Sequence, residues 1–153
     1  MRTQYMIRRA GLADLDRILE IERSSFGHEA YDRKLFAYYQ ERCGDLFLVS
    51  GRPGRVSGYM VTCVRGGRAE LVSVAVDPAC RQKGAASALL ESTLRRLGRR
   101  GVSRLGLVVR VNNRPALAFY EKYGFRRRRL ARGYYEDGGD GIAMSRAIPS
   151  PGN

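Results

Sequence analysis

The stretch Leu71–Leu90, LVSVAVDPACRQKGAASALL, decides the fold because it joins a strand, a charged loop and a helix without interruption. The apolar, β-branched run that ends at Val76 predicts a buried strand, and Asp77-Pro78 closes it. Apolar residues then recur at helical spacing, which predicts a helix that ends near Gly98 or Gly101. The segment therefore predicts a sheet with a helix packed on it.

The loop between this strand and helix, Arg81-Gln82-Lys83-Gly84, has the features of an anion site. The first turn of a helix leaves amide N–H groups unpaired, and the positive end of the helix dipole points toward the loop. Gly84 allows a close backbone approach, and Arg81 or Lys83 adds charge. The phosphate loops GxxxxGK[ST] and GxGxxG are absent. A cationic loop that only caps a core helix remains the alternative.

The rest of the chain predicts a mixed α/β fold in which strands outnumber helices. Helical spacing marks two helices before the quoted stretch and one after it, and turn-rich segments such as GRPGR separate the strands into an antiparallel meander. The predicted strands are Tyr5–Arg8, Leu46–Ser50, Ser57–Val64, Glu70–Val76, Arg104–Val109, Arg126–Arg132 and Gly141–Arg146, and the other helices are Leu12–Arg23, Lys34–Arg42 and Arg114–Tyr123.

Length and composition favour one cytoplasmic domain, residues 1–148, followed by a disordered tail, residues 149–153. The 153 residues contain no apolar run of the roughly 20 residues that span a membrane, and the N-terminus lacks the apolar core of a signal peptide. Three widely spaced cysteines predict reduced thiols. The single histidine, His28, argues against a histidine-rich metal centre, so no metal is expected.

The formal net charge of +13 raises the question of a nucleic-acid partner. Only three of the 28 basic residues are lysines, so the arginine excess can reflect coding composition rather than binding. The basic residues nevertheless gather in two clusters, Arg95, Arg96, Arg99, Arg100 and Arg104 in one and Arg126–Arg129 with Arg132 in the other. A solvated or phosphate-adjacent face and a nucleic-acid surface both remain open.

Residues Ala69 to Ile148 resemble a known family, the GCN5-related N-acetyltransferases (GNAT). Arg81-x-x-Gly84-x-Ala86 is similar to the family's pyrophosphate loop, and LVVRVNNRPALAFYEKYGF resembles the coenzyme-binding segment that follows it. GYYEDGGDGIAMSRAI resembles the C-terminal hairpin of the protein N-terminal and ribosomal-protein-alanine acetyltransferases. The resemblance implies a mostly antiparallel mixed sheet of about seven strands flanked by about four helices, with acetyl-CoA as co-substrate.

The resemblance also implies which residues hold acetyl-CoA. The backbone of Val74, Ala75 and Val76 would bind the pantetheine arm, and Asn113 would contact it. Tyr120 corresponds to the tyrosine proposed to protonate the leaving thiolate, a step open to a phenol whose pKa lies near 10; a plain core tyrosine is the alternative. The pyrophosphate would lie against the loop residues Arg81, Gln82, Lys83, Gly84, Ala85 and Ala86.

The general base is where the chain departs from the family members that it resembles most. Ribosomal-protein-alanine acetyltransferases carry a glutamate in a motif like LEVR, which here reads Leu107-Val108-Val109-Arg110. Histone-acetylating members carry it instead at the position of Glu70. Burial in an apolar strand raises the pKa of a glutamate, so Glu70 is the predicted base, acting directly or through a water. Glu29, in the loop between the first two helices, is the second candidate.

The acceptor is inferred from Tyr134 and Tyr135, which correspond to a tyrosine pair that binds the backbone of a substrate's first residues in the family. Nearby Glu136, Asp137 and Asp140 would attract a protonated amine. Cys80 precedes the anion loop, where a helix N-terminus favours a thiolate. Direct transfer needs no acetyl-cysteine, however, so Cys80 is predicted to be an ordinary buried thiol.

These observations predict an N-acetyltransferase that acts on the N-terminal α-amino group of a protein, such as a ribosomal protein. Two other functions remain open: acetylation of lysine or a small amine, and a non-catalytic basic module that binds RNA or the ribosome. No membrane partner is expected.

Overall fold

A computed structural model describes residues 5–27, 31–81 and 83–150, and the strands in these ranges form one seven-stranded sheet. The strands lie in the order β1-β2-β3-β4-β5-β7-β6, and every neighbouring pair is antiparallel except the parallel pair β4 and β5. Their bounds are β1 Ile7–Arg9, β2 Phe47–Ser50, β3 Gly58–Arg65, β4 Arg68–Val76, β5 Arg104–Arg110, β6 Arg126–Ala131 and β7 Gly141–Ala147. No helix in the described ranges is long and apolar enough to cross a membrane.

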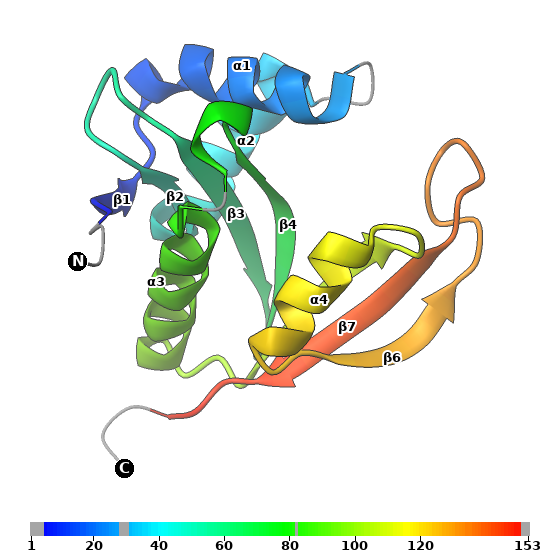
Figure 1. Ribbon diagram of the computed structural model, residues 1–153. Coiled ribbons are helices and arrows are strands. Elements are labelled where there is room, and N and C mark those ends of the chain that lie inside the picture. The colour runs from blue at the N-terminus through cyan, green and yellow to red at the C-terminus, as the bar shows by residue number, and fades with distance from the viewer. Residues whose placement is uncertain (1–4, 28–30, 82, 151–153) are drawn as a thin grey trace.

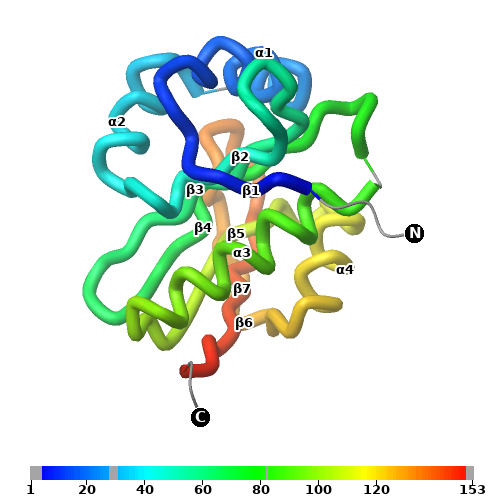
Figure 2. The backbone as a smooth tube through the Cα atoms, turned by 90° about the vertical axis from the view of Figure 1, so that its left-hand side faces the viewer, coloured from blue at the N-terminus to red at the C-terminus, as the bar shows by residue number. Residues whose placement is uncertain are grey.

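Four α-helices cover the two faces of the sheet (Figures 1 and 2). Helices α3 (Ala85–Arg99) and α4 (Arg114–Lys122) pack on one face, and helices α1 (Leu15–Phe26) and α2 (Arg33–Cys43) pack on the other. Each helix buries an apolar stripe, as the periodicity predicts. The α1 and α2 helices cover only the β1–β4 half of the sheet, so the same face of β5, β7 and β6 carries no helix within the described residues.

The predicted mixed α/β architecture is confirmed, with helix and strand ends either as predicted or shifted by at most three residues. The predicted first helix divides into a short 3-10 turn, Leu12–Asp14, followed by α1. Asp14 explains this division, because its carboxylate accepts a hydrogen bond from the Gly11 amide and forms an ion pair with Arg8. The predicted tail, residues 149–153, lies partly outside the described residues.

Strands β4 and β5 separate after only three paired residues, which opens the sheet. Their register joins Arg68, Ala69 and Glu70 to Arg104, Leu105 and Gly106, and the strands pair no further. The backbone groups of β4 beyond Glu70 therefore face the opening without a strand partner. Sequence patterns do not reveal such a separation, because both strands keep their alternation of buried and exposed residues.

A β-bulge lies at the start of this opening. Val61 pairs with Ser73 and Thr62 with Leu71, so Val72 is an extra residue on β4. Val72 packs against the core beneath α1 and α2, and the Ser73 hydroxyl lies 3.0 Å from the hydroxyl of Tyr59 in that core. A bulge turns successive side chains toward one face and bends the strand. The bend carries the end of β4 away from β5.

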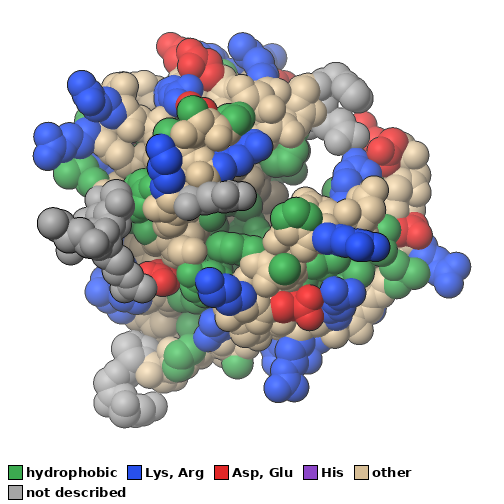
Figure 3. All heavy atoms as spheres, viewed as in Figure 1, with side chains coloured by type: hydrophobic (Ala, Val, Ile, Leu, Met, Phe, Trp, Pro, Cys, Tyr) green, Lys and Arg blue, Asp and Glu red, His purple; other side chains and the backbone are tan. Residues whose placement is uncertain are grey.

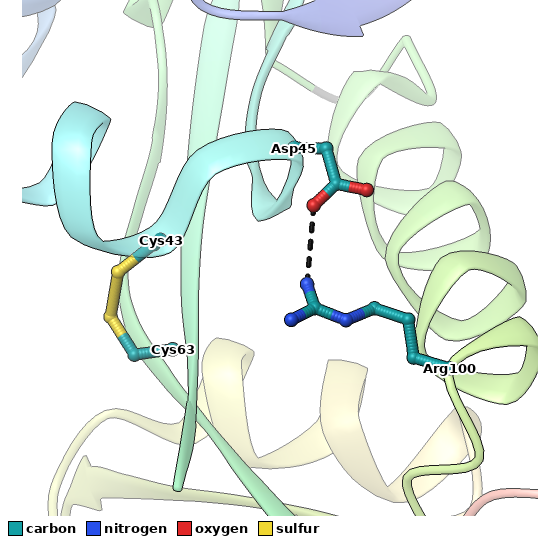
Figure 4. Close-up of a disulfide and its surroundings, with 4 residues drawn as sticks. All are labelled: Cys43, Asp45, Cys63 and Arg100. Carbon is teal, nitrogen blue, oxygen red and sulfur yellow. Dashed lines mark hydrogen bonds and ion pairs between the residues drawn. A yellow bond between two sulfur atoms is a disulfide. The ribbon is translucent and has the colours of Figure 1, made fainter.

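The prediction of three reduced thiols is wrong for two of them, because Cys43 and Cys63 form a disulfide (Figure 4). The helix end that carries Cys43 and the strand that carries Cys63 pack together, with Cα atoms 5.1 Å apart, a proximity that sequence spacing does not disclose. A crosslink that closes a loop of this length stabilises a fold by about 3 kcal/mol. Cys63 is also the cross-strand partner of Glu70, so the disulfide holds α2 beside the strands that position this glutamate.

Candidate active site

The loop before α3 has the geometry of an anion site. Gly84 is the N-cap of α3 in the left-handed region, with a φ of 93°, where a side chain would be strained. It supplies no side-chain cap, so the first-turn amides of Ala85 and Ala86 remain available to a ligand. The Tyr5 hydroxyl donates to the Lys83 carbonyl at 2.7 Å and fixes the loop. Gln82, predicted to contact the pyrophosphate, lies outside the described residues.

Arg81 holds the loop in place rather than facing the helix end. Its guanidinium donates to the Val76 carbonyl at 3.2 Å and to the Ser25 hydroxyl at 3.2 Å. From the sequence, either Arg81 or Lys83 could add charge to the anion site. Because the Arg81 guanidinium is tied to β4 and α1, Lys83 is the alternative that stays open.

The surface is hollowed over the upper part of β4, between the loop that precedes α3 and helix α4, and hydrophobic side chains line the hollow (Figure 3). Val74 packs against the core beneath α3 and α4, where Tyr120 also lies. The hollow thus runs from the anion loop toward the opening between β4 and β5. An elongated ligand with a phosphorylated end and an extended apolar arm fits this combination of sites.

Tyr120 lies on α4 at the buried side of this region. Its ring makes edge contacts with Phe119 and Phe125, and burial raises the pKa of its phenol. No hydrogen bond joins its hydroxyl to another described residue. Tyr120 is therefore a core residue whose protonated O–H group has no acceptor among the described side chains and backbone groups.

Asn113 caps α4, because its side-chain oxygen accepts the Ala116 amide at 3.2 Å. The capping interaction uses the acceptor of the amide side chain and leaves its NH₂ group as a donor. The predicted contact between Asn113 and the coenzyme arm is compatible with that division. Sequence reasoning identified the residue but not its capping role.

Glu70 lies on the sheet face that carries α1 and α2, between Cys63 of β3 and Gly106 of β5. Gly106 has no side chain, and Val108 is the next β5 residue on the same face. The carboxylate is exposed, so the burial on which the base hypothesis relied is absent. Its negative charge raises the pKa of Tyr39 and of Tyr134, after the larger effect of burial.

Four tyrosines surround this part of the sheet. Tyr134 and Tyr135 stack edge to face with ring centres 5.0 Å apart in the loop between β6 and β7. Both influence the pKa of Tyr31, which burial raises most strongly, and Tyr39 also contributes to that shift. The structure thus brings the predicted pair together with Tyr31 and Tyr39, which the sequence analysis did not select. Tyr31 stands two residues after Glu29 in the sequence. This proximity to a candidate site residue is the signal that could have identified Tyr31.

The acidic residues of the β6–β7 loop serve the loop itself. Asp137 forms an ion pair with Arg110 at 3.2 Å, and the Gly139 amide and then Arg110 lower its pKa. Asp140 accepts the Gly133 amide at 2.8 Å. Asp137 is thus paired with Arg110, and the Asp140 carboxylate holds the turn. The expectation that the acidic residues of this loop attract a protonated amine stays a prediction. Glu29, the second base candidate, lies outside the described residues.

Two further sequence expectations concern the loop cysteine and metals. Cys80 is a free thiol, but it is half-exposed rather than buried as predicted. Its position in the short turn Pro78–Cys80, before the anion loop, explains the exposure. No group of three or more potential ligands that could hold a metal ion is found among the described residues.

Sequence reasoning missed Glu22, a residue on the buried face of α1 that is only 2% exposed. Burial raises its pKa to about 7, and hydrogen bonds from the Tyr31 amide and the Ser73 hydroxyl oppose the shift. One of its oxygens, Oε2, has no hydrogen-bond partner. Glu22 occupies a helical position where an exposed glutamate is unremarkable, so only the packed structure reveals its burial.

Glu22 predicts an unusual dependence of stability on pH. The folded state binds more protons than the unfolded state between about pH 4.5 and pH 7, so stability falls as pH rises through this window. We expect Glu22→Gln to raise the free energy of unfolding at pH 8 by about 3 kcal/mol and to flatten its slope. Urea unfolding at pH 5 and pH 8 measures the free energy of unfolding and its change with pH. Glu41→Gln, an exposed control on α2, should change neither, and an unaltered slope in Glu22→Gln would contradict the assignment.

Comparison with known proteins agrees with this geometry. Residues 15–125 match the acetyltransferase (GNAT) family. An N-alpha-acetyltransferase of Sulfolobus acidocaldarius is 32% identical over 154 residues, which cover 92% of this chain and 91% of the relative. Ard1 from Thermoplasma volcanium superposes with a TM-score of 0.91 at 26% identity, covering 97% of this chain and all of that one. The ribosomal-protein-S18-alanine N-acetyltransferase from Escherichia coli superposes with a TM-score of 0.84 at 32% identity. The superposition covers 98% of this chain and 97% of that one.

Proposed function

The chain belongs to the acetyltransferase (GNAT) family, and we propose that it moves an acetyl group from acetyl-CoA to the N-terminal α-amino group of a protein. The observation that carries the proposal is the opening between β4 and β5, with the anion loop at one end and the tyrosine pair on the opposite face. The named relatives include an N-alpha-acetyltransferase and a ribosomal-protein-S18-alanine acetyltransferase. A ribosomal protein is accordingly one candidate acceptor.

The residues of the chain divide the binding of acetyl-CoA between two elements. The α3 amides at Ala85 and Ala86, with Lys83, would bind the pyrophosphate. The backbone of Val74 to Val76, which has no strand partner on the β5 side, would hydrogen-bond the pantetheine arm as a neighbouring strand does, although the Val76 carbonyl already accepts a hydrogen bond from Arg81. Bound in this way, the thioester end of the arm would lie in the opening, toward the level of Glu70 and Tyr120.

The acceptor would enter from the opposite face. Tyr134 is 53% exposed, and its hydroxyl is free to bind the backbone of an incoming peptide. Glu70 lies on the same face and is open to solvent, so it would take a proton from the ammonium group through a water and leave the neutral amine to attack. Tyr120 would donate a hydrogen bond to the departing sulfur. Transfer is direct, and Cys80 has no role in it.

Mass spectrometry tests the proposal with one peptide that carries a free N-terminus and an internal lysine. After incubation with acetyl-CoA, we expect acetyl on the α-amine and not on the lysine. The same peptide with a blocked N-terminus is the control and should remain unmodified. Acetylation of the lysine in both peptides would overturn the choice of acceptor, while release of free CoA without any peptide product would indicate a different acceptor class.

A further inference from the structure

The end of the molecule remote from the anion loop carries a concentration of arginines that the acetyl-transfer site does not use. Four of them, Arg104, Arg126, Arg128 and Arg146, line one cleft at the junction of β5, β6 and β7. Together with the neighbouring Arg68 they form what we call the basic end. These residues come from four different strands.

The sheet register places these arginines side by side. Arg68 of β4 pairs with Arg104 of β5, and Arg104 pairs with Ala147 of β7. Arg126 of β6, the strand on the other side of β7, lies opposite Ser145 of β7. Like charges directly opposite each other on neighbouring strands destabilise a sheet. The pairing of Arg68 with Arg104 is therefore unfavourable in the isolated protein.

The guanidinium groups of Arg104 and Arg128 converge on one hydroxyl. Arg104 Nη1 and Arg128 Nε each donate to Ser145 Oγ at 2.8 Å. Neither guanidinium forms an ion pair with any described carboxylate, and the same is true of Arg126. Two cations held beside a neutral acceptor repel each other, and an anion placed between them would remove that repulsion.

The acidic residues of this part of the chain do not neutralise the basic end. Glu121 is paired with Arg127, and Asp45 is paired with Arg100 at the end of α3 (Figure 4). Glu70 is the one carboxylate on the same sheet face of β4, and it lies two residues beyond Arg68 toward the tyrosines. Helix α1 and the acidic β6–β7 loop lie at the opposite end of the molecule (Figure 1).

We propose that the basic end binds the phosphate backbone of a nucleic acid. Its unpaired arginines are spread over several strands, as an extended polyanion requires, and guanidinium groups match phosphate geometry. Strand β7 separates the basic end from the tyrosine loop by about 20 Å, at about 3.4 Å per residue. A bound nucleic acid would leave the acceptor site accessible, so binding and acetyl transfer can occur together.

Fluorescence anisotropy tests the inference with a labelled 20-base-pair RNA duplex and a DNA duplex of the same sequence, each titrated at several salt concentrations. We expect binding of one or both that weakens steeply with salt. The double variant Arg126→Gln/Arg128→Gln should bind about tenfold more weakly and lower the log–log salt slope by about 2. Comparison of the two duplexes identifies which nucleic acid supplies the phosphate.

The matched control is Arg52→Gln/Arg55→Gln, which removes the same charge from exposed positions in the β2–β3 turn. This control should bind like the unaltered protein, and both variants should keep the kcat/KM for a short uncharged peptide, which confirms folding. Equal weakening in the two variants would overturn the site, because only net charge would then matter. Displacement of the duplex by a glutamate-rich peptide at micromolar concentration would assign the basic end to an acidic protein segment instead.

Discussion

Glu70→Gln is expected to lower kcat/KM for a peptide acceptor by about 10²-fold to 10³-fold, with little change in the affinity for acetyl-CoA. Attack on a thioester needs a neutral amine, and removal of a positioned general base commonly costs a factor of this size. Glu70 is accessible on the acceptor face, and its charge already acts on Tyr134 and Tyr39. Glutamine keeps the shape of the side chain, and Glu70 forms no ion pair with a described residue, so folding should be preserved.

Steady-state kinetics with acetyl-CoA and the peptide of the acceptor test measure the loss. Glu91→Gln, an exposed glutamate on α3, controls for the removal of one surface charge and should leave kcat/KM unchanged. Val108 lies on the same sheet face, at the position where the resemblance to ribosomal-protein-alanine acetyltransferases implies a glutamate. We therefore expect Glu70→Gln combined with Val108→Glu to regain part of the rate. An unaltered rate in Glu70→Gln alone would remove Glu70 from the mechanism.

Local patterns were sufficient to predict the helices and strands because each element satisfies its own signals, whereas the arrangement of the sheet was implied by the family resemblance. The strand and helix of Leu71–Leu90 follow from a switch of apolar spacing, and glycine marks the ends of the helices at Gly44 and Gly124. These signals depend on neighbours within a few residues. The separation of β4 from β5 does not depend on such local neighbours. It arises from a bulge in β4 that is defined only by the pairing register between β4 and β3.

The site was predictable where a motif fixes the backbone and unpredictable where a role depends on packing. Gly84 stands in the conformation that the anion loop requires. Arg81, by contrast, interacts with Ser25, 56 residues earlier in the chain. Glu22 owes its raised pKa to burial between elements that the sequence does not place together. The Cys43–Cys63 disulfide was missed for the same reason.

Tyr120→Phe is expected to lower kcat by about 10²-fold while the KM for acetyl-CoA changes little. Because burial raises the pKa of Tyr120, its phenol stays protonated throughout the working range. Full proton transfer to a thiolate, whose conjugate acid has a pKa near 8.5, is then unfavourable. The hydroxyl instead stabilises the developing negative charge on sulfur by a hydrogen bond, an interaction whose loss costs about this factor at comparable sites.

The kinetics of Tyr120→Phe separate this role from plain core packing. Phenylalanine keeps the edge contacts with Phe119 and Phe125, so the melting temperature should change by only a few degrees. Tyr123→Phe, one turn further along the chain and in contact with Phe119, is the control and should retain kcat. A hydrogen-bond donor that never ionises contributes no ionisation step to the pH dependence of kcat. The pH profile of kcat should therefore keep its shape in Tyr120→Phe. A normal kcat with a lowered melting temperature would instead make Tyr120 a structural residue, and the sulfur would then need another donor.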